Sequence, residues 1–162
     1  MTRPVLQELS IEPYNDISIL NSVAANLDNM KFKKVKTKYA KGGWDALSLH
    51  GYGNHALDIL KPGVLKSSVN IDTKLQWTTL SLITTMKPIL NMLKKLPCEF
   101  ERIRFMRLEA GKVINKHTDK IDKDIGFDDG NIIRIHIPIR TNDNVVFTVY
   151  EKVKDEEGTE YN

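Results

Sequence analysis

Cysteine is almost absent from this 162-residue chain, which has Cys98 alone. An internal disulfide framework is therefore excluded, and no zinc site can be built from cysteine pairs. Long apolar runs are also missing, and residues 1–10 contain no apolar stretch behind a basic start that would indicate a secretion signal. These absences predict a chain without a membrane segment, located in the reducing cytoplasm.

A strong charge of either sign is absent as well. The 24 Lys and Arg residues nearly balance the 21 Asp and Glu residues, so the net charge of +3 permits a polyanionic partner without implying one. With 41% hydrophobic and 28% charged residues, the composition is that of a globular protein. We expect one domain over residues 1–162 and a flexible polar tail at residues 152–162.

Two segments have the apolar spacing of helices. Residues 17–27 follow Asp16, a good N-cap, and repeat apolar side chains at helical intervals. Residues 85–96 have Pro88 near the start, where a helix tolerates it, and Pro97 just past the end. We therefore predict a helix in each segment.

Short strands are predicted around and after these helices. Alternating apolar residues and turn signals place them at residues 44–50, 102–108, 113–116, 132–139 and 145–153. Helices followed by a run of short strands indicate an α+β fold that is mainly β, with an antiparallel sheet or sandwich.

The segment Lys31 to Lys41 carries six lysines interleaved with apolar residues. One interpretation is a solvated edge strand, in which lysines discourage pairing with another chain. The other is a surface for a polyanion, although the arginines and aromatic residues typical of nucleic-acid surfaces are few here. The first interpretation is favoured, and a nucleic-acid partner is not expected.

The pattern at residues 132–139 separates two kinds of side chain. Alternation along a strand places four isoleucines on one face and both Arg134 and His136 on the other. A guanidinium and an imidazole on one face suit the recognition of a carboxylate. The competing interpretation is an ordinary exposed sheet face.

His117 and Asp119 have the spacing of two metal ligands. Two imidazoles and one carboxylate form the facial triad of non-haem Fe(II) oxygenases, in which open positions remain for other ligands. A His-x-Asp tripeptide is common by chance, and a polar surface turn is the alternative for an isolated one.

The order of several motifs along the chain is a more specific signal than this tripeptide alone. The chain has an R-x-x-R-L strand at residues 104–108, a glycine turn, H-x-D at 117–119, R-x-H-x-P-I at 134–139 and a Thr-Asn turn. This order resembles the aspartyl/asparaginyl β-hydroxylase family and its free-proline hydroxylase relatives. The clear resemblance covers about the last third of the chain, with a core motif at residues 102–150, and the strand at Trp44 is similar to the family more loosely.

The resemblance implies a double-stranded β-helix, or jelly roll, preceded by N-terminal helices. It also implies a dioxygenase that uses Fe(II) and 2-oxoglutarate to hydroxylate Asp, Asn or Pro side chains, free or in a peptide. His117 and Asp119 would bind the iron, and His136 would contact the cosubstrate carboxylate. Arg134 and Arg107 would lie near substrate or cosubstrate anions.

The chain departs from the family pattern at its end. Family members continue into further strands, which supply a distal iron-binding histidine and a basic residue for 2-oxoglutarate. Here no histidine follows His136, no arginine follows Arg140, and the sequence ends at Asn162. Three interpretations stay open: a fragment of a longer protein, a short form without activity, and a site completed in another way.

Two further expectations follow from this departure. An incomplete jelly roll leaves sheet edges open, and a homodimer would cover them. The alternative function is a jelly-roll module without catalysis, which binds a small anion through Arg134 and His136 or a polyanion through Lys31 to Lys41.

Overall fold

The computed structural model describes residues 16–38, 40–59, 75–117 and 134–150, together with the backbone of residues 153–154 and 160–161. In chain order its elements are α1 (Ile17–Asp28), β1 (Lys33–Thr37), β2 (Ala40–Tyr52), β3 (Leu75–Trp77), α3 (Leu80–Thr85), α4 (Lys87–Leu93), β4 (Ile103–Arg107), β5 (Val153–Lys154) and β6 (Glu160–Tyr161). Helices combined with an antiparallel sheet of four strands confirm the α+β class.

Helix α1 begins where the sequence predicts. The Asp16 carboxylate accepts hydrogen bonds from the backbone N–H groups of Ser18 and Ile19, at 2.9 and 3.3 Å. These bonds satisfy two of the donors that a helix start leaves without intrahelical partners. The helical spacing then buries Leu20 and Val23 on one side. The predicted helix at residues 17–27 is therefore confirmed.

The sheet is built around β2, which pairs antiparallel with β1, β3 and β4. Asp45 of β2 is paired with both Lys34 of β1 and Arg107 of β4, so these two strands lie on opposite edges of β2. Within the described ranges β1 pairs with β2 alone, as expected for an edge strand in the lysine-rich segment. Every residue of β2 from position 43 to 52 is buried.

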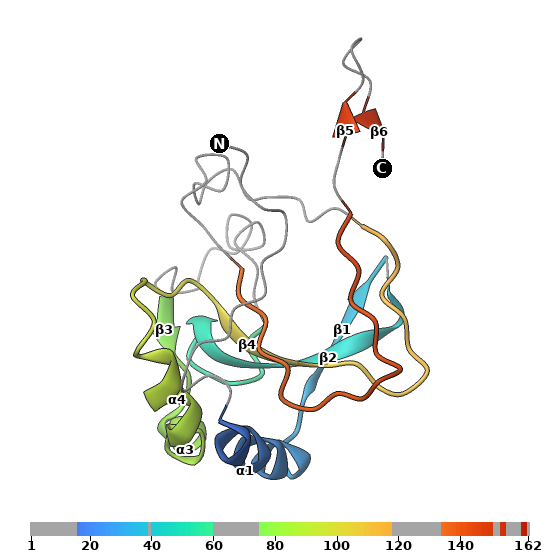
Figure 1. Cartoon of the computed structure of the whole chain (residues 1–162). Helices are drawn as coiled ribbons and strands as arrows, with labels where there is room; N and C mark the ends of the chain where they lie inside the picture. Colours follow the sequence, from blue (N-terminus) through green and yellow to red (C-terminus); the bar gives the residue numbers. More distant parts are fainter. Residues whose placement is uncertain are drawn as a thin grey trace.

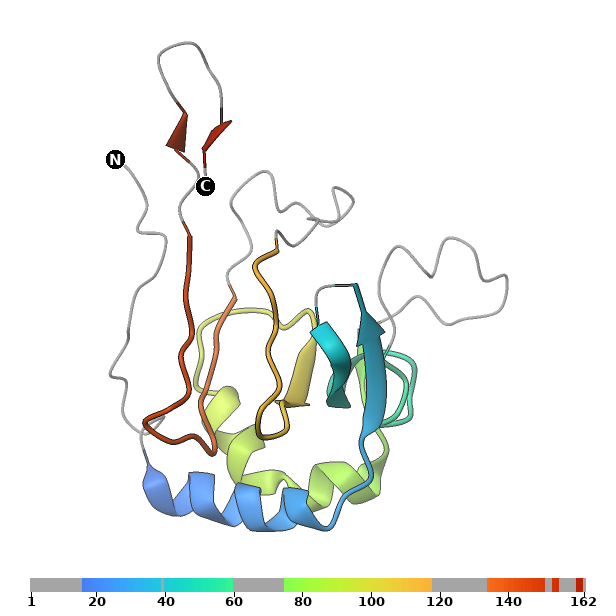
Figure 2. The same cartoon turned by 90° about the vertical axis from the view of Figure 1, so that its right-hand side faces the viewer.

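The main core lies between this sheet and the helices, which form a layer on one side of it (Figures 1 and 2). Leu47, Leu49 and Phe105 point from β2 and β4 toward Val23 of α1 and Met86 before α4. A second, smaller cluster is formed by Ala40, Trp44 and Ala46. Alternation along β2 accounts for the two clusters, since successive side chains point to opposite faces.

The second predicted helix corresponds to α4, and a separate short helix, α3, precedes it. α3 ends at Thr85, Met86 separates the two, and α4 runs from Lys87 to Leu93 with Pro88 in its first turn. Pro88 has no backbone N–H and is tolerated only at a helix start. The prediction over residues 85–96 was therefore wrong at its ends and right about a helix that begins near Pro88.

Three of the predicted strands are not regular strands in the described residues. Residues 113–116 contribute only an isolated bridge between Ala40 and Ile114. Residues 134–139 and 145–150 have no strand assignment, and Val146 and Phe147 are 82% and 64% exposed. A strand needs a paired neighbour to satisfy its backbone, and in the described part residues 134–139 and 145–150 have no such pairing, while residues 113–116 have only the one bridge. The jelly roll therefore stays a prediction.

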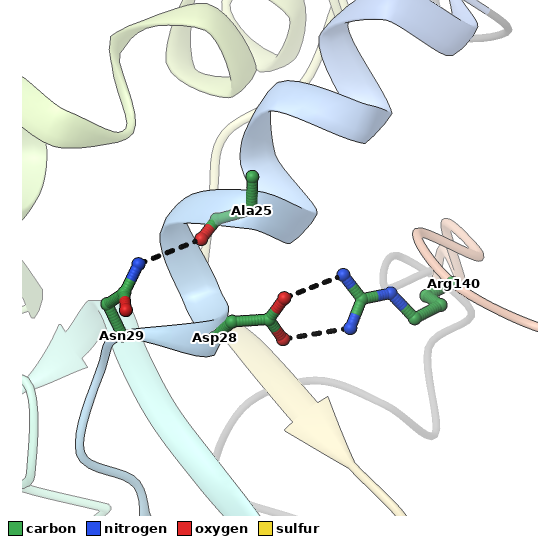
Figure 3. A network of polar contacts seen from close by, with 4 residues as sticks. All are labelled: Ala25, Asp28, Asn29 and Arg140. Atoms are coloured by element: carbon green, nitrogen blue, oxygen red, sulfur yellow. Dashed lines mark hydrogen bonds and ion pairs between the residues drawn. The ribbon is translucent and has the colours of Figure 1, made fainter.

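Residues 134–150 run down toward α1 and back again (Figure 2). The predicted turn at residues 141–144 is confirmed, because the N–H of Val145 donates to the Asn142 carbonyl at 3.0 Å. Just before the turn, Arg140 forms two parallel bonds to the Asp28 carboxylate at 2.8 and 2.9 Å, while Asn29 donates to the Ala25 carbonyl (Figure 3). The turn is thus fixed to the C-terminal end of α1.

The expected tail contains a short antiparallel pair. Val153 is opposite Tyr161, and Lys154 is opposite Glu160. The flexibility expected of residues 152–162 and the single-domain organisation both stay predictions. Among the described residues, no helix has the length and apolar character needed to cross a bilayer.

Candidate active site

β4 separates its two arginines onto opposite faces of the sheet. Phe105 belongs to the helix-facing core, and strand alternation places Arg107 on that side. Arg104 and Met106 point the other way, and the Arg104 guanidinium lies over the Trp44 ring, 5.7 Å from its centroid. The arginine pair of the R-x-x-R-L motif is therefore not one cluster.

A cavity of about 500 Å³ lies between β4 and the segment that begins at Arg134. Most of its lining residues are apolar, and charged side chains are interspersed among them. The charged and titratable ones that matter for binding are Glu99, Glu101, Arg102, Arg104, Arg134 and His136. Two acids face three arginines and one imidazole, so the lining favours an anionic ligand.

Arg134 and His136 both line this cavity. Of the isoleucines expected on the opposite face, Ile137 and Ile139 pack against the main core, but the cavity lining includes Ile137 as well as Ile135, which is 43% exposed. The His136 ring also contacts Phe147, with 5.1 Å between the ring centroids. This contact joins the part of residues 134–150 that precedes the turn at 141–144 to the part that follows it.

Arg107 lies apart from that cavity. Its Nη2 donates to Oδ2 of the buried Asp45 at 2.9 Å, and its guanidinium is 4.4 Å from the centroid of the Phe32 ring. Both contacts belong to the sheet and its connection to α1. A role of Arg107 in binding substrate or cosubstrate stays a prediction.

His117 follows β4, is the last residue of the described range 75–117, and is exposed. Its Nδ1 is 2.8 Å from the carbonyl oxygen of Asn115, and because a carbonyl only accepts, Nδ1 carries the proton. The lone pair of a neutral ring is then on Nε2. His117 is not among the residues that line the cavity of Arg134 and His136. Asp119 lies outside the described residues.

No group of three His, Cys, Asp or Glu residues that could hold a metal is present in the described ranges. Because Asp119 is outside those ranges, the proposed His117 and Asp119 pair is not tested by this search. His50 is buried in β2, donates from Nδ1 to the Glu101 carbonyl at 2.6 Å and contacts the Trp77 ring. These contacts describe a structural histidine.

The sequence reasoning missed Arg102 and Arg104 as cavity residues. The sequence spacing could have indicated them, because two arginines two positions apart point to the same side of a strand. Arg102 is held by Glu101, with 2.8 Å between Nε and Oε1. The pairing neutralises part of the Arg102 charge.

Comparison with known proteins gives one match, which agrees with the motif order. The family model described as Aspartyl/Asparaginyl beta-hydroxylase matches residues 17–159. The chain belongs to this family. As an aspartyl/asparaginyl β-hydroxylase family member, it has a hydroxylase-like, oxidoreductase character, and the match extends from α1 through all the predicted site residues. No curated protein and no solved structure matches the chain.

Proposed function

We propose that the chain is an Fe(II)- and 2-oxoglutarate-dependent hydroxylase of an Asp, Asn or Pro side chain. The observation that carries the proposal is the family match over residues 17–159, which includes His117, Asp119, Arg134 and His136. Iron(II) with 2-oxoglutarate and oxygen would supply the oxidising power to place a hydroxyl group on an unactivated carbon. The chain's own residues would hold these groups.

The geometry at His117 fits a metal ligand. Histidines that bind metals usually donate their other ring N–H to a carbonyl or carboxylate, which fixes the tautomer and the ring orientation. The Asn115 carbonyl occupies that role for Nδ1 of His117. Nε2 is then the donor atom for iron, and Asp119 would supply a carboxylate oxygen.

The basic cavity fits a dicarboxylate. Arg134 would bind one carboxylate through two parallel N–H bonds, the geometry for which guanidinium groups are suited. His136 would donate to the same group, and Arg104 lies across the cavity on β4. Both β4 and the segment that begins at Arg134 would therefore contribute to cosubstrate binding.

The same cavity supports a second candidate function, a module that binds a small anion without catalysis. The arginines and the histidine in the cavity lining favour this module, because anion binding by these side chains needs no metal. The two candidates differ in one measurable property: only the hydroxylase requires His117 for ligand binding.

Calorimetry under nitrogen tests the proposal. The unmodified protein is expected to bind Fe(II) and, with iron present, 2-oxoglutarate. His117→Ala should weaken Fe(II) binding by about a hundredfold or more, since loss of a ligand costs at least as much as loss of its supporting hydrogen bond. His55→Ala is the matched control, because His55 is exposed and lies outside the motif.

Two results would contradict the hydroxylase. One is the absence of Fe(II) binding by the unmodified protein, and the other is unchanged Fe(II) binding by His117→Ala. Binding of 2-oxoglutarate that is independent of iron and lost in Arg134→Met would instead support the anion-binding module.

A further inference from the structure

A groove rich in lysine lies beside β1 and the start of β2. It has a volume of about 470 Å³, and its lining includes Lys34, Lys36, Thr37, Lys38, Lys41 and Asn115. We call this the lysine groove. It is a different place from the arginine-lined cavity at β4, because the two have no lining residue in common.

The charge of the lysine groove is not neutralised within the described residues. None of its four lysines forms an ion pair there, although ion pairs hold the arginines at positions 102, 107 and 140. A fifth ammonium is close by: a Cβ added to Gly42, which also lines the groove, would lie 2.7 Å from Nζ of Lys112. Several like charges along one groove create a potential that attracts a chain of negative charges.

Thr37 gives an independent indication of a missing ligand. It lines the lysine groove, and its hydroxyl is buried without a hydrogen-bond partner in the described part of the protein. Buried polar atoms nearly always have a partner in native structures, so each exception calls for an explanation. Because this hydroxyl has no contact with solvent, a carboxylate in the groove would accept its hydrogen bond only after rotation of the Thr37 side chain.

The lysine groove extends to the segment that carries the proposed iron ligand. Asn115 lines the groove, and its carbonyl oxygen is the acceptor for Nδ1 of His117. The bridge between Ala40 and Ile114 fixes this segment beside the start of β2, as Figure 2 also shows. A ligand that lies along the lysines therefore ends next to the backbone that holds His117.

We propose that the lysine groove is the docking surface for an acidic polypeptide, whose target side chain is thereby directed to His117. That this polypeptide is the substrate rests on the proposed function. A nucleic acid is a poorer fit, because the described lining has no aromatic side chain for base stacking and no arginine. Lysine ammonium groups are point charges that pair with single carboxylates.

Fluorescence polarisation with a labelled peptide of alternating Asp and Gly tests the docking surface. The unmodified protein should bind it, and binding should weaken between low salt and physiological ionic strength. The combined variant Lys34→Gln, Lys36→Gln and Lys38→Gln should bind about tenfold more weakly or worse. These lysines are exposed, so glutamine preserves the fold, and circular dichroism confirms it.

The matched control is Lys94→Gln with Lys95→Gln, two exposed lysines at the end of α4 that do not line the groove. This variant should keep the original affinity. Equal affinity of the combined groove variant and the unmodified protein would overturn the proposal. Tighter binding of a single-stranded oligonucleotide than of the acidic peptide would also overturn it, in favour of a nucleic-acid surface.

The location is tested by nuclear magnetic resonance of the His117 ring, assigned by comparison with His117→Gln. Addition of the acidic peptide should shift this resonance, and bound peptide without a shift would overturn the placement. Peptide binding needs no iron, so the two proposals fail separately. Peptide binding without Fe(II) binding would support the docking surface and contradict the hydroxylase. Fe(II) binding without peptide binding would support the hydroxylase and contradict the docking surface.

Discussion

β2 and residues 134–150 both have alternating apolar side chains, yet they occupy different environments. From position 43 to 52 all of β2 is buried between paired strands, helices and the smaller cluster. In residues 134–150 only Ile137 and Ile139 pack against the main core, and the returning part is exposed. The predicted binding residues Arg134 and His136 are in the exposed segment. The buried core strand and the predicted binding residues Arg134 and His136 therefore lie in different parts of the chain.

The largest expected effect separates the two regions by stability. Leu49→Ala removes a fully buried side chain from β2 and should cost about 2–5 kcal/mol of the free energy of unfolding. Val146→Ala, at a position 82% exposed, should change it by about 0.5 kcal/mol or less. Urea denaturation measures both, and similar losses for the two variants would break the comparison.

An intermediate effect on the free energy of unfolding is expected at Arg107, the predicted site residue that is paired with buried Asp45 of β2. Arg107→Met leaves the buried Asp45 carboxylate without its ion-pair partner and should cost about 1–3 kcal/mol. Arg107→Lys keeps the charge and should recover part of this loss. Adding Asp45→Asn to Arg107→Met should recover most of it, because the unpaired charge is removed.

The same Arg107→Met protein sharpens the assignment of function. Lower stability with unchanged 2-oxoglutarate affinity would place Arg107 in the sheet alone. Weaker 2-oxoglutarate binding by the folded variant would show that the cosubstrate role inferred from the family resemblance also holds.

The smallest effect is a pH dependence at the junction of the two regions. The hydrogen bonds from Arg140 hold the pKa of Asp28 below its ordinary value of 3.8. A lowered folded-state pKa means that the pair contributes its full stability above the ordinary value and loses it as pH falls through the lowered one. At neutral pH the free energy of unfolding of Asp28→Asn should thus be slightly lower than that of the unmodified protein. In acid the two free energies should become equal.

Urea midpoints at a series of pH values, at low salt, measure this difference. The pair is exposed, so salt should reduce the effect. A difference between Asp28→Asn and the unmodified protein that grows in acid would contradict the assigned direction of the pKa shift.

Local signals in the sequence accounted for much of the stable region. The Asp16 cap, the helical spacing of α1 and the alternation around Trp44 are each readable within a dozen residues, and all appear in the structure. The pairing of β2 with β4 depends on residues far apart in the chain. Local patterns give no register for such a pair, so the partner of Arg107 in β2, Asp45, could not be assigned from the sequence.

The roles predicted for the candidate site residues stay predictions. Alternation predicted that Arg134 and His136 share a face, and both line the cavity at β4, as do Ile135 and Ile137. It did not show that Arg102 and Arg104 complete the same cavity, because the approach of residues 134–137 to β4 is a tertiary contact. The neighbourhood of Asn115 with the lysines likewise depends on the bridge to Ala40, between residues that local pattern does not connect.

The Asp28 and Arg140 pair has a consequence for helix α1. Asp28 is the last residue of α1, where the helix dipole disfavours a negative charge. The guanidinium of Arg140 offsets this conflict, so α1 is more stable when the turn of residues 134–150 is in place. Thermodynamic linkage then runs in both directions. A ligand that stabilises residues 134–150 against β4 would therefore also reduce the population of frayed α1, a helix that the ligand does not touch.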